Sequence, residues 1–161
     1  MGYRIGIIGP ESTGKSTLAR YLAKRYQGVL VPEYARGYVE RKGTTEVTWE
    51  ELCEIAKHQI EELEAISHRP STFFFFDTEL IVTKVWFEYA FGRVPEWLNE
   101  NIRRYPMDVY LLTYPDVPWI PDPARSNGSD AIRKELFDRY ESEIQALDKP
   151  YYIIRHCFDR N

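Results

Sequence analysis

The stretch GIIGPESTGKSTLARYLAKRY, residues 6–26, decides the fold of this chain. It begins with a short apolar run, continues through a glycine-rich turn and ends with apolar residues spaced as in an α-helix. Gly9, Gly14, Lys15 and Ser16 match the pattern GxxxxGK[ST], in which backbone N–H groups surround phosphate. The lysine of this pattern reaches the β- and γ-phosphates, and the serine hydroxyl takes a place on Mg²⁺. The stretch therefore predicts a strand, a phosphate-binding loop (P-loop) and a helix.

Length and composition predict one domain over residues 1–161. Hydrophobic residues make up 43% and charged residues 29%, which argues against a disordered chain. The net charge of −4 offers no basic field for nucleic acid. No segment has the pattern of an export signal or a membrane span, and Cys53 and Cys157 form no metal-ligand spacing. We expect a cytoplasmic protein with neither nucleic acid nor membrane as a partner.

Strand and helix patterns alternate along the rest of the chain. Strands are expected at 3–8, 29–31, 73–77, 109–114 and 151–156. Helices are expected at 15–26, 33–43, 48–67, 79–91, 95–105 and 129–147. Thr48 and Glu51 form a capping box at the start of one of these helices. The alternation predicts a parallel sheet with helices on both faces and ligands at the carboxyl ends of the strands.

Two carboxylates lie at such strand ends. Asp77 ends the run FFFFD, where a carboxylate holds Mg²⁺ directly or through water; alternatively it caps the following helix. Glu33 follows the strand at 29–31, where a carboxylate accepts the proton of an attacking hydroxyl. The alternative for Glu33 is a surface position in the first turn of a helix, favoured by the helix dipole.

Several polar side chains have two possible roles each. Residues 115–128 have the length and polarity of a lid, so Arg125 and Arg133 either bring charge to the γ-phosphate or are ordinary solvated charges. Arg36 contacts phosphate or acceptor, or forms a surface salt bridge. Thr17 adds a hydroxyl contact to an inner phosphate, or simply packs.

Aromatic residues are expected near the strand ends, where a flat base would stack on them, although most aromatic residues belong to cores. The candidates are Tyr34, Trp86, Tyr89, Trp97 and Trp119. The three histidines form no ligand spacing and are interpreted as structural or exposed; they are His58, His68 and His156.

Several segments together resemble the ribosylnicotinamide (nicotinamide riboside) kinase domain of the bacterial NadR type. The likeness covers nearly the whole chain in the expected order. The segments are GPESTGKSTLA (9–19), VPEYARGYVE (31–40), FFFFDTELIVTKVW (73–86), VYLLTYPDVPWIPDPAR (109–125) and, more weakly, RKELFDRYE (133–141).

This resemblance implies a P-loop NTPase fold of the nucleoside-kinase kind, with a five-stranded parallel sheet in the order 2-3-1-4-5 and a lid. It also implies transfer of the γ-phosphate of ATP, with Mg²⁺, to the 5′-hydroxyl of nicotinamide riboside. The product would be nicotinamide mononucleotide, an intermediate of NAD salvage.

The resemblance and the residue patterns give one candidate site. The nucleotide-binding residues are Gly9, Pro10, Glu11, Ser12, Thr13, Gly14, Lys15, Ser16, Thr17, Arg125 and Arg133, with Ser16 and Asp77 serving the metal. The acceptor-binding residues are Glu33, Tyr34, Arg36, Asp77, Trp86 and Tyr89. The catalytic residues are Lys15, Glu33, Asp77 and Arg125, and either Glu33 or Asp77 takes the proton.

Two departures from the family pattern limit what carries over. The chain has no HxGH signature, so the adenylyltransferase activity of bifunctional members is not expected here. Pro123 and Ala124 replace the glycine-containing turn expected before the lid arginine. Two alternative functions stay open: a kinase of another nucleoside or small alcohol, and a nucleotide-dependent switch or ATPase binding module.

Overall fold

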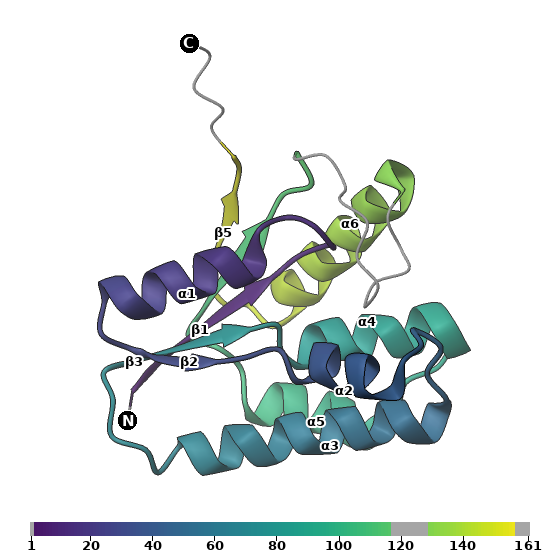
Figure 1. Cartoon of the computed structure of the whole chain (residues 1–161), viewed down its shortest axis with the longest axis horizontal. Helices are drawn as coiled ribbons and strands as arrows, with labels where there is room; N and C mark the ends of the chain where they lie inside the picture. The colour runs from purple at the N-terminus through teal and green to yellow at the C-terminus, as the bar shows by residue number, and fades with distance from the viewer. Residues whose placement is uncertain (1, 117–128, 157–161) are drawn as a thin grey trace.

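The computed structural model describes residues 2–116 and 129–156, and five parallel strands in this part form one sheet (Figure 1). The strands are β1 (Tyr3–Ile8), β2 (Val29–Val31), β3 (Phe73–Asp77), β4 (Val109–Thr113) and β5 (Tyr151–Ile154). Their order is β2-β3-β1-β4-β5. The predicted sheet order is therefore confirmed, and all four pairings are parallel.

Six helices are present in the described part of the chain. They are α1 (Lys15–Arg25), α2 (Tyr34–Lys42), α3 (Trp49–Ile66), α4 (Leu80–Phe91), α5 (Glu96–Arg104) and α6 (Asp130–Ala146). Each matches a predicted helix, with ends that differ by at most one residue. The predicted capping box also forms, because the Thr48 hydroxyl accepts from the Glu51 amide and the Glu51 carboxylate accepts from the Thr48 amide, both at 3.1 Å.

The aromatic run of β3 contributes apolar side chains to the cores on both faces of the sheet. Side chains alternate along a strand, so Phe75 faces α1 together with Ile5 and Ile7 of β1. Phe74 and Phe76 point to the opposite face, where they pack into the larger core beneath the other helices. Figure 1 shows α1 on one side of the sheet and α3 and α5 on the other. Burial on both faces explains why this central strand is apolar until its last residue.

Two strands end earlier than the sequence predicts: β4 ends at Thr113, one residue short of its predicted end, and β5 ends two residues short. Apolar residues suggest a strand over 151–156, but β5 ends at Ile154. Beyond it the backbone amide of His156 donates to the Asp116 carboxylate at 2.9 Å. A side chain has therefore taken the place of the next strand pairing.

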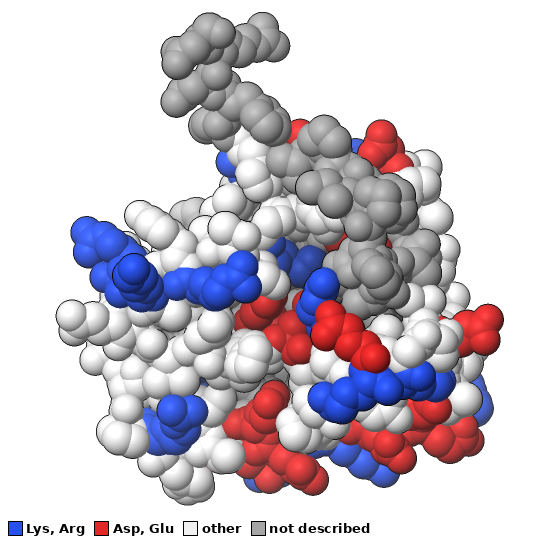
Figure 2. Space-filling view, viewed as in Figure 1, with Lys and Arg blue, Asp and Glu red and all other residues white. Residues whose placement is uncertain are grey.

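The surface carries no single sign of charge on the face drawn in Figure 2, where basic and acidic side chains are interspersed. Across residues 2–116 and 129–156, no helix combines the length and apolarity needed to cross a membrane.

Candidate active site

The P-loop, residues 9–16, connects β1 to α1 at the carboxyl edge of the sheet. Gly14 is the N-cap of α1 and has φ +82°, a left-handed conformation that glycine adopts without steric cost. Gly9 approaches β4 so closely that a Cβ there would collide with the Thr113 side chain. Among the described residues no side chain caps α1, and its first turn contains no acidic residue. The N–H groups and dipole at this helix end therefore favour an anion.

Hydrogen bonds hold the P-loop in shape. The buried hydroxyl of Thr13 donates to the Pro10 carbonyl at 2.7 Å and lies 2.5 Å from the hydroxyl of Thr113, at the end of β4. The ammonium group of Lys15 donates to the same carbonyl at 2.8 Å, and its side chain is also buried. Burying an ammonium group is costly unless polar groups surround it. The fold therefore keeps a positive charge inside the loop.

Three further predicted nucleotide-binding residues are Glu11, Ser12 and Thr17. Glu11 is buried, and Ser12 has φ +55°, an uncommon conformation for a residue with a side chain. Thr17 is exposed in the first turn of α1, which excludes the alternative that it merely packs. Its hydroxyl is therefore free of the core at the helix end that favours an anion.

The structure brings Ser16 and Asp77 together although 61 positions separate them. The Ser16 hydroxyl donates to Asp77 Oδ2 at 2.6 Å. Asp77 lies beside Ile7 in the parallel register of β1 and β3, so both strands deliver their ends to the same point. The carboxylate is 5% exposed. The alternative that Asp77 caps the next helix fails, because Glu79 is the N-cap of α4 and accepts from the Ile81 amide at 2.8 Å.

These two side chains fit Mg²⁺ rather than a metal held entirely by protein. Both offer oxygen atoms, and Mg²⁺ prefers oxygen ligands with one or two carboxylates plus phosphate oxygens. Within the described ranges, no group of three or more His, Cys, Asp or Glu residues could hold a metal by itself. A cation bound here would therefore depend on phosphate for the rest of its ligands.

Arg133 lies against the P-loop instead of on the surface. It belongs to the first turn of α6 and is only 2% exposed. Its guanidinium group donates to the Glu11 carbonyl at 3.4 Å and to Asp130 at 3.0 Å. The alternative of a solvated surface charge is therefore excluded. Arg125, the other predicted arginine, lies outside the described residues, as do residues 117–128 of the proposed lid.

A narrow cleft, here called the strand-end cleft, adjoins Asp77 at the ends of β2 and β3. Its lining residues are Val31, Pro32, Tyr34, Gln59, Glu62, Leu63, Phe76, Thr78, Glu79 and Leu80. Complete burial raises the pKa of the Glu79 carboxyl to about 7, although hydrogen bonds from the Ile81 and Leu80 amides act in the opposite direction. Asp77 belongs to the P-loop side, and the two residues after it belong to the cleft.

Thr78, between the two carboxylates, has a strained backbone. Its φ is +71°, a value that is unfavourable for a β-branched residue, and its amide donates to the Ile7 carbonyl at 2.9 Å. Its hydroxyl oxygen is buried and makes no hydrogen bond to any residue that the structure describes. Strain of this kind persists where the surrounding structure imposes it and is common at functional sites.

The predicted acceptor-binding residues separate into two groups. Tyr34 lines the strand-end cleft, and its ring stacks on His58 with centroids 3.6 Å apart. Glu33 is half-buried at the N-cap of α2, next to the cleft. Arg36 forms an ion pair with Glu40 at 3.2 Å, as its salt-bridge alternative predicts.

Trp86 and Tyr89 lie farther along α4 and do not line the strand-end cleft. Trp86 packs against the core, and Tyr89 is 43% exposed. Their contact with an acceptor stays a prediction.

Comparison with known proteins identifies the family. A family model described as an AAA domain matches residues 4–160. The chain belongs to this AAA domain family.

One curated relative of this AAA domain is the trifunctional NAD biosynthesis/regulator protein NadR of Escherichia coli K12. It is 30% identical over 135 residues, which are 82% of this chain and 33% of the relative. The chain therefore spans about a third of the length of the relative it matches. This match confirms the resemblance to NadR.

Solved structures give the same result. The AAA domain matches a NadR protein in complex with NR at 25% identity and a TM-score of 0.78, covering 99% of this chain and 45% of that one. A NadR protein in complex with NAD and AMP-PNP gives 24% identity and a TM-score of 0.76, with 98% and 45% coverage. Thymidylate kinase from Ehrlichia chaffeensis shares the fold at 14% identity, with a TM-score of 0.67 and 99% and 90% coverage. The predicted P-loop kinase fold is therefore confirmed.

Some residues of the site escaped the sequence reasoning. Thr113 braces the P-loop, Glu79 caps α4 at the cleft, and Gln59 lines the cleft while accepting from the Thr83 hydroxyl at 2.7 Å. Polar residues directly after an apolar strand are a usable signal, and it would have found Glu79. Gln59 lies on the apolar face of α3, and no sequence signal distinguishes it from the buried residues beside it.

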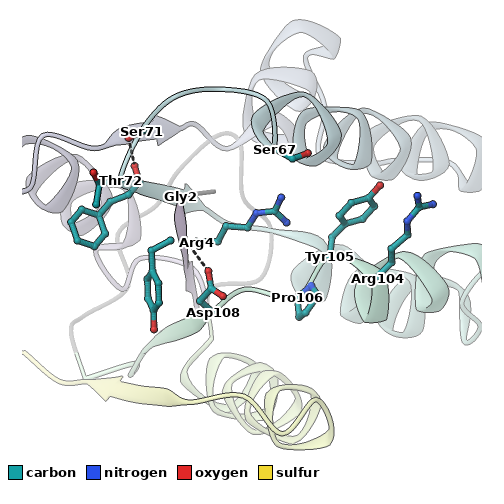
Figure 3. A pocket seen from close by; sticks show the side chains of 11 residues that line it. Gly2, Arg4, Ser67, Ser71, Thr72, Arg104, Tyr105, Pro106 and Asp108 are labelled. Atoms are coloured by element: carbon teal, nitrogen blue, oxygen red, sulfur yellow. Dashed lines mark hydrogen bonds between the residues drawn. The ribbon is translucent and has the colours of Figure 1, made fainter.

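A second cavity lies at the opposite, amino edge of the sheet and has a volume of about 850 Å³. Arg4 and Tyr105 point into it, with Arg104 beyond the tyrosine ring (Figure 3). Asp108 accepts from the Arg4 backbone amide at 2.7 Å. None of the predicted site residues that the structure describes lines this cavity.

Proposed function

We propose that residues 1–161 form one P-loop kinase domain that phosphorylates the 5′-hydroxyl of nicotinamide riboside with ATP and Mg²⁺. The products are nicotinamide mononucleotide and ADP. The observation that carries this proposal is the continuity of Asp77, Thr78 and Glu79. The first contacts Ser16 of the P-loop, and the next two line the strand-end cleft. A phosphate donor and an acceptor would therefore bind side by side.

The relatives support this choice of ligands. A NadR protein that matches this chain at 25% identity was solved with NR. Another NadR structure holds AMP-PNP, and the uncapped N-terminus of α1 in this chain supports phosphate binding at the P-loop. Because the reaction draws on ATP, we expect the protein to work in the cytoplasm.

The donor side supplies positive charge where phosphoryl transfer develops negative charge. Its transition state spreads charge over the three γ-phosphate oxygens, so catalysis depends on positioning and electrostatic stabilisation. Lys15 reaches these oxygens from inside the loop, and the loop N–H groups hold the β-phosphate. Arg133 adds a buried positive charge behind the loop. Ser16 and Asp77 would hold Mg²⁺, which would supply positive charge to the phosphate groups.

The acceptor side places a hydroxyl in line with the γ-phosphate. Tyr34 offers an aromatic face to the nicotinamide ring, and Thr78 and Glu79 offer polar atoms to the ribose. Glu33 or Asp77 accepts the proton of the attacking hydroxyl. Exclusion of water from the cleft favours transfer to the riboside over hydrolysis.

A panel of acceptors tests this function. Purified protein with ATP and Mg²⁺ is given nicotinamide riboside, thymidine, deoxyadenosine or no acceptor, and both ADP and 5′-monophosphate are measured. We expect nicotinamide riboside to give the highest kcat/KM. A higher kcat/KM for another nucleoside would show that the protein is a kinase with a different acceptor. ADP formation at the same rate without any acceptor would point to an ATPase or switch and overturn the proposal.

A further inference from the structure

His156 is held beside the P-loop by a single carboxylate, that of Asp116. The His156 ring lies with Nδ1 2.8 Å from Asp116 Oδ1, and the His156 backbone amide donates to Asp116 Oδ2 at 2.9 Å. His156 thus forms hydrogen bonds with both carboxylate oxygens of Asp116. An ionised carboxylate only accepts hydrogen bonds, so Nδ1 carries the proton of this contact. Although burial acts against its charge, hydrogen bonds from His156 lower the pKa of the Asp116 carboxyl.

The backbone on both sides of this pair is anchored. The Tyr114 amide donates to the Ile154 carbonyl at 2.9 Å, which joins the ends of β4 and β5. The guanidinium group of Arg155 lies 3.9 Å from the centroid of the Tyr114 ring. Figure 1 shows β4 and β5 side by side, with their ends toward the N-terminus of α1. His156 is therefore fixed in position although it lies beyond the last strand.

The second ring nitrogen of His156 faces the P-loop. A Cβ placed on Gly14 would lie 3.1 Å from His156 Nε2, so the ring packs directly on this glycine. Gly14 precedes Lys15 and starts α1, the helix end that favours an anion. Since the Nδ1–H is donated to Asp116, Nε2 is the polar atom that the ring offers on this side. It is an acceptor in the neutral ring and a second N–H donor in the imidazolium, which is the form that a phosphate oxygen requires. The His156 side chain keeps 32% of its surface accessible, so a ligand on the loop can reach it.

The other histidines lack this combination. His58 stacks on Tyr34 and pairs with Glu62 at 3.3 Å, and both partners line the strand-end cleft. His68 is exposed between α3 and β3, at the amino edge. Only His156, of the three described histidines, contacts the phosphate-binding loop.

We propose that His156 contacts the bound nucleotide through Nε2 and that Asp116 is a positioning residue that orients the ring. The ligand class is a nucleoside di- or triphosphate, whose phosphate or ribose oxygens lie on the P-loop. The inference rests on the proposed function only in taking the P-loop as a nucleotide site. The identity of the acceptor does not enter it. The proposal gives His156 a role in addition to the structural one that its pairing with Asp116 shows.

The test is calorimetric binding of Mg·ADP to the full chain, without any acceptor. We expect His156→Ala to weaken binding about tenfold, since one charge-assisted hydrogen bond is lost. His156→Gln keeps a donor near the position of Nε2 and should recover part of the affinity. Asp116→Asn should weaken binding by a smaller factor, because the ring is still present and has lost only its orientation. His68→Ala is the matched control and should bind as the wild type does.

Steady-state kinetics then separate contact from support of the fold. His156→Ala should raise KM for ATP and leave KM for the acceptor within about twofold. Unchanged Mg·ADP affinity in a folded His156→Ala protein would overturn the proposal. So would an equal rise in both KM values, since this is the result of general distortion. Because ADP binding is measured alone, a protein that binds ADP and fails to phosphorylate nicotinamide riboside disproves the proposed function while His156 is still tested.

Discussion

The two edges of the sheet differ in how deeply their charged side chains are buried. At the amino edge, a cavity of about 850 Å³ is bordered by Arg4 and Arg104, whose side chains are half-buried and exposed. At the carboxyl edge, the cleft is narrow, but Lys15, Asp77 and Arg133 are each at least nine-tenths buried. A charge in contact with water costs little, whereas a buried charge must be compensated by its surroundings. Buried and compensated charge therefore marks the site better than the volume of a cavity does.

Loss of the charge inside the P-loop should have the largest effect. Lys15→Ala removes the ammonium group that we propose to contact the β- and γ-phosphates, so we expect kcat to fall roughly 100- to 1,000-fold. The loop keeps its Thr13–Thr113 contact, so circular dichroism and the melting temperature should change little. A near-normal rate in this variant would mean that the carboxyl edge is not where transfer occurs.

Loss of the carboxylate at the end of β3 should come next. Asp77→Asn keeps a partner for the Ser16 hydroxyl but removes a negative charge from the proposed metal site, so we expect roughly a 100-fold lower rate at low Mg²⁺. Titration of the rate with Mg²⁺ should show a higher half-saturating concentration than in the wild type. Ser16→Ala is the companion variant and should shift the titration in the same direction. Identical Mg²⁺ curves would remove Asp77 from the metal site.

Strain at Thr78 gives a smaller effect, measured on stability. At φ +71°, alanine retains the steric cost and glycine does not, so Thr78→Gly should be about 1 kcal/mol more stable than Thr78→Ala. Both variants lose the buried hydroxyl, and both should lose activity to a similar extent. Urea denaturation and acceptor KM measure the two effects separately. If the alanine variant were the more stable, the left-handed backbone at this position would be in doubt.

The amino edge should show the smallest effect. Arg4→Gln and Arg104→Gln change the two arginines of the larger cavity and touch nothing on the carboxyl edge. We expect kcat and both KM values to stay within about twofold of the wild type, because charges that contact water and lie at the opposite edge of the sheet are screened. A tenfold loss of activity would show that the two edges are coupled and would break the comparison.

The sequence predicted those parts of the molecule that depend on short-range patterns. The five strands and six helices follow from apolar periodicity, and the contact between Ser16 and Asp77 follows from a P-loop and a carboxylate at adjacent strand ends. Thr113 and the Asp116–His156 pair were not predicted, because which residues of different loops meet depends on the packing of the whole sheet. For Arg133 the sequence allowed either a role at the phosphate or a solvated surface charge, and its burial against Glu11 excludes the second.

The most direct test is the stoichiometry of the reaction. Wild-type protein is mixed with Mg·ATP and nicotinamide riboside, and ADP and nicotinamide mononucleotide are quantified over the same interval, with Lys15→Ala as the control. The two products should appear in a 1:1 ratio and together fall away in the control. ADP that accumulates without nicotinamide mononucleotide, or a phosphorylated product that persists in Lys15→Ala, would contradict transfer at the carboxyl edge.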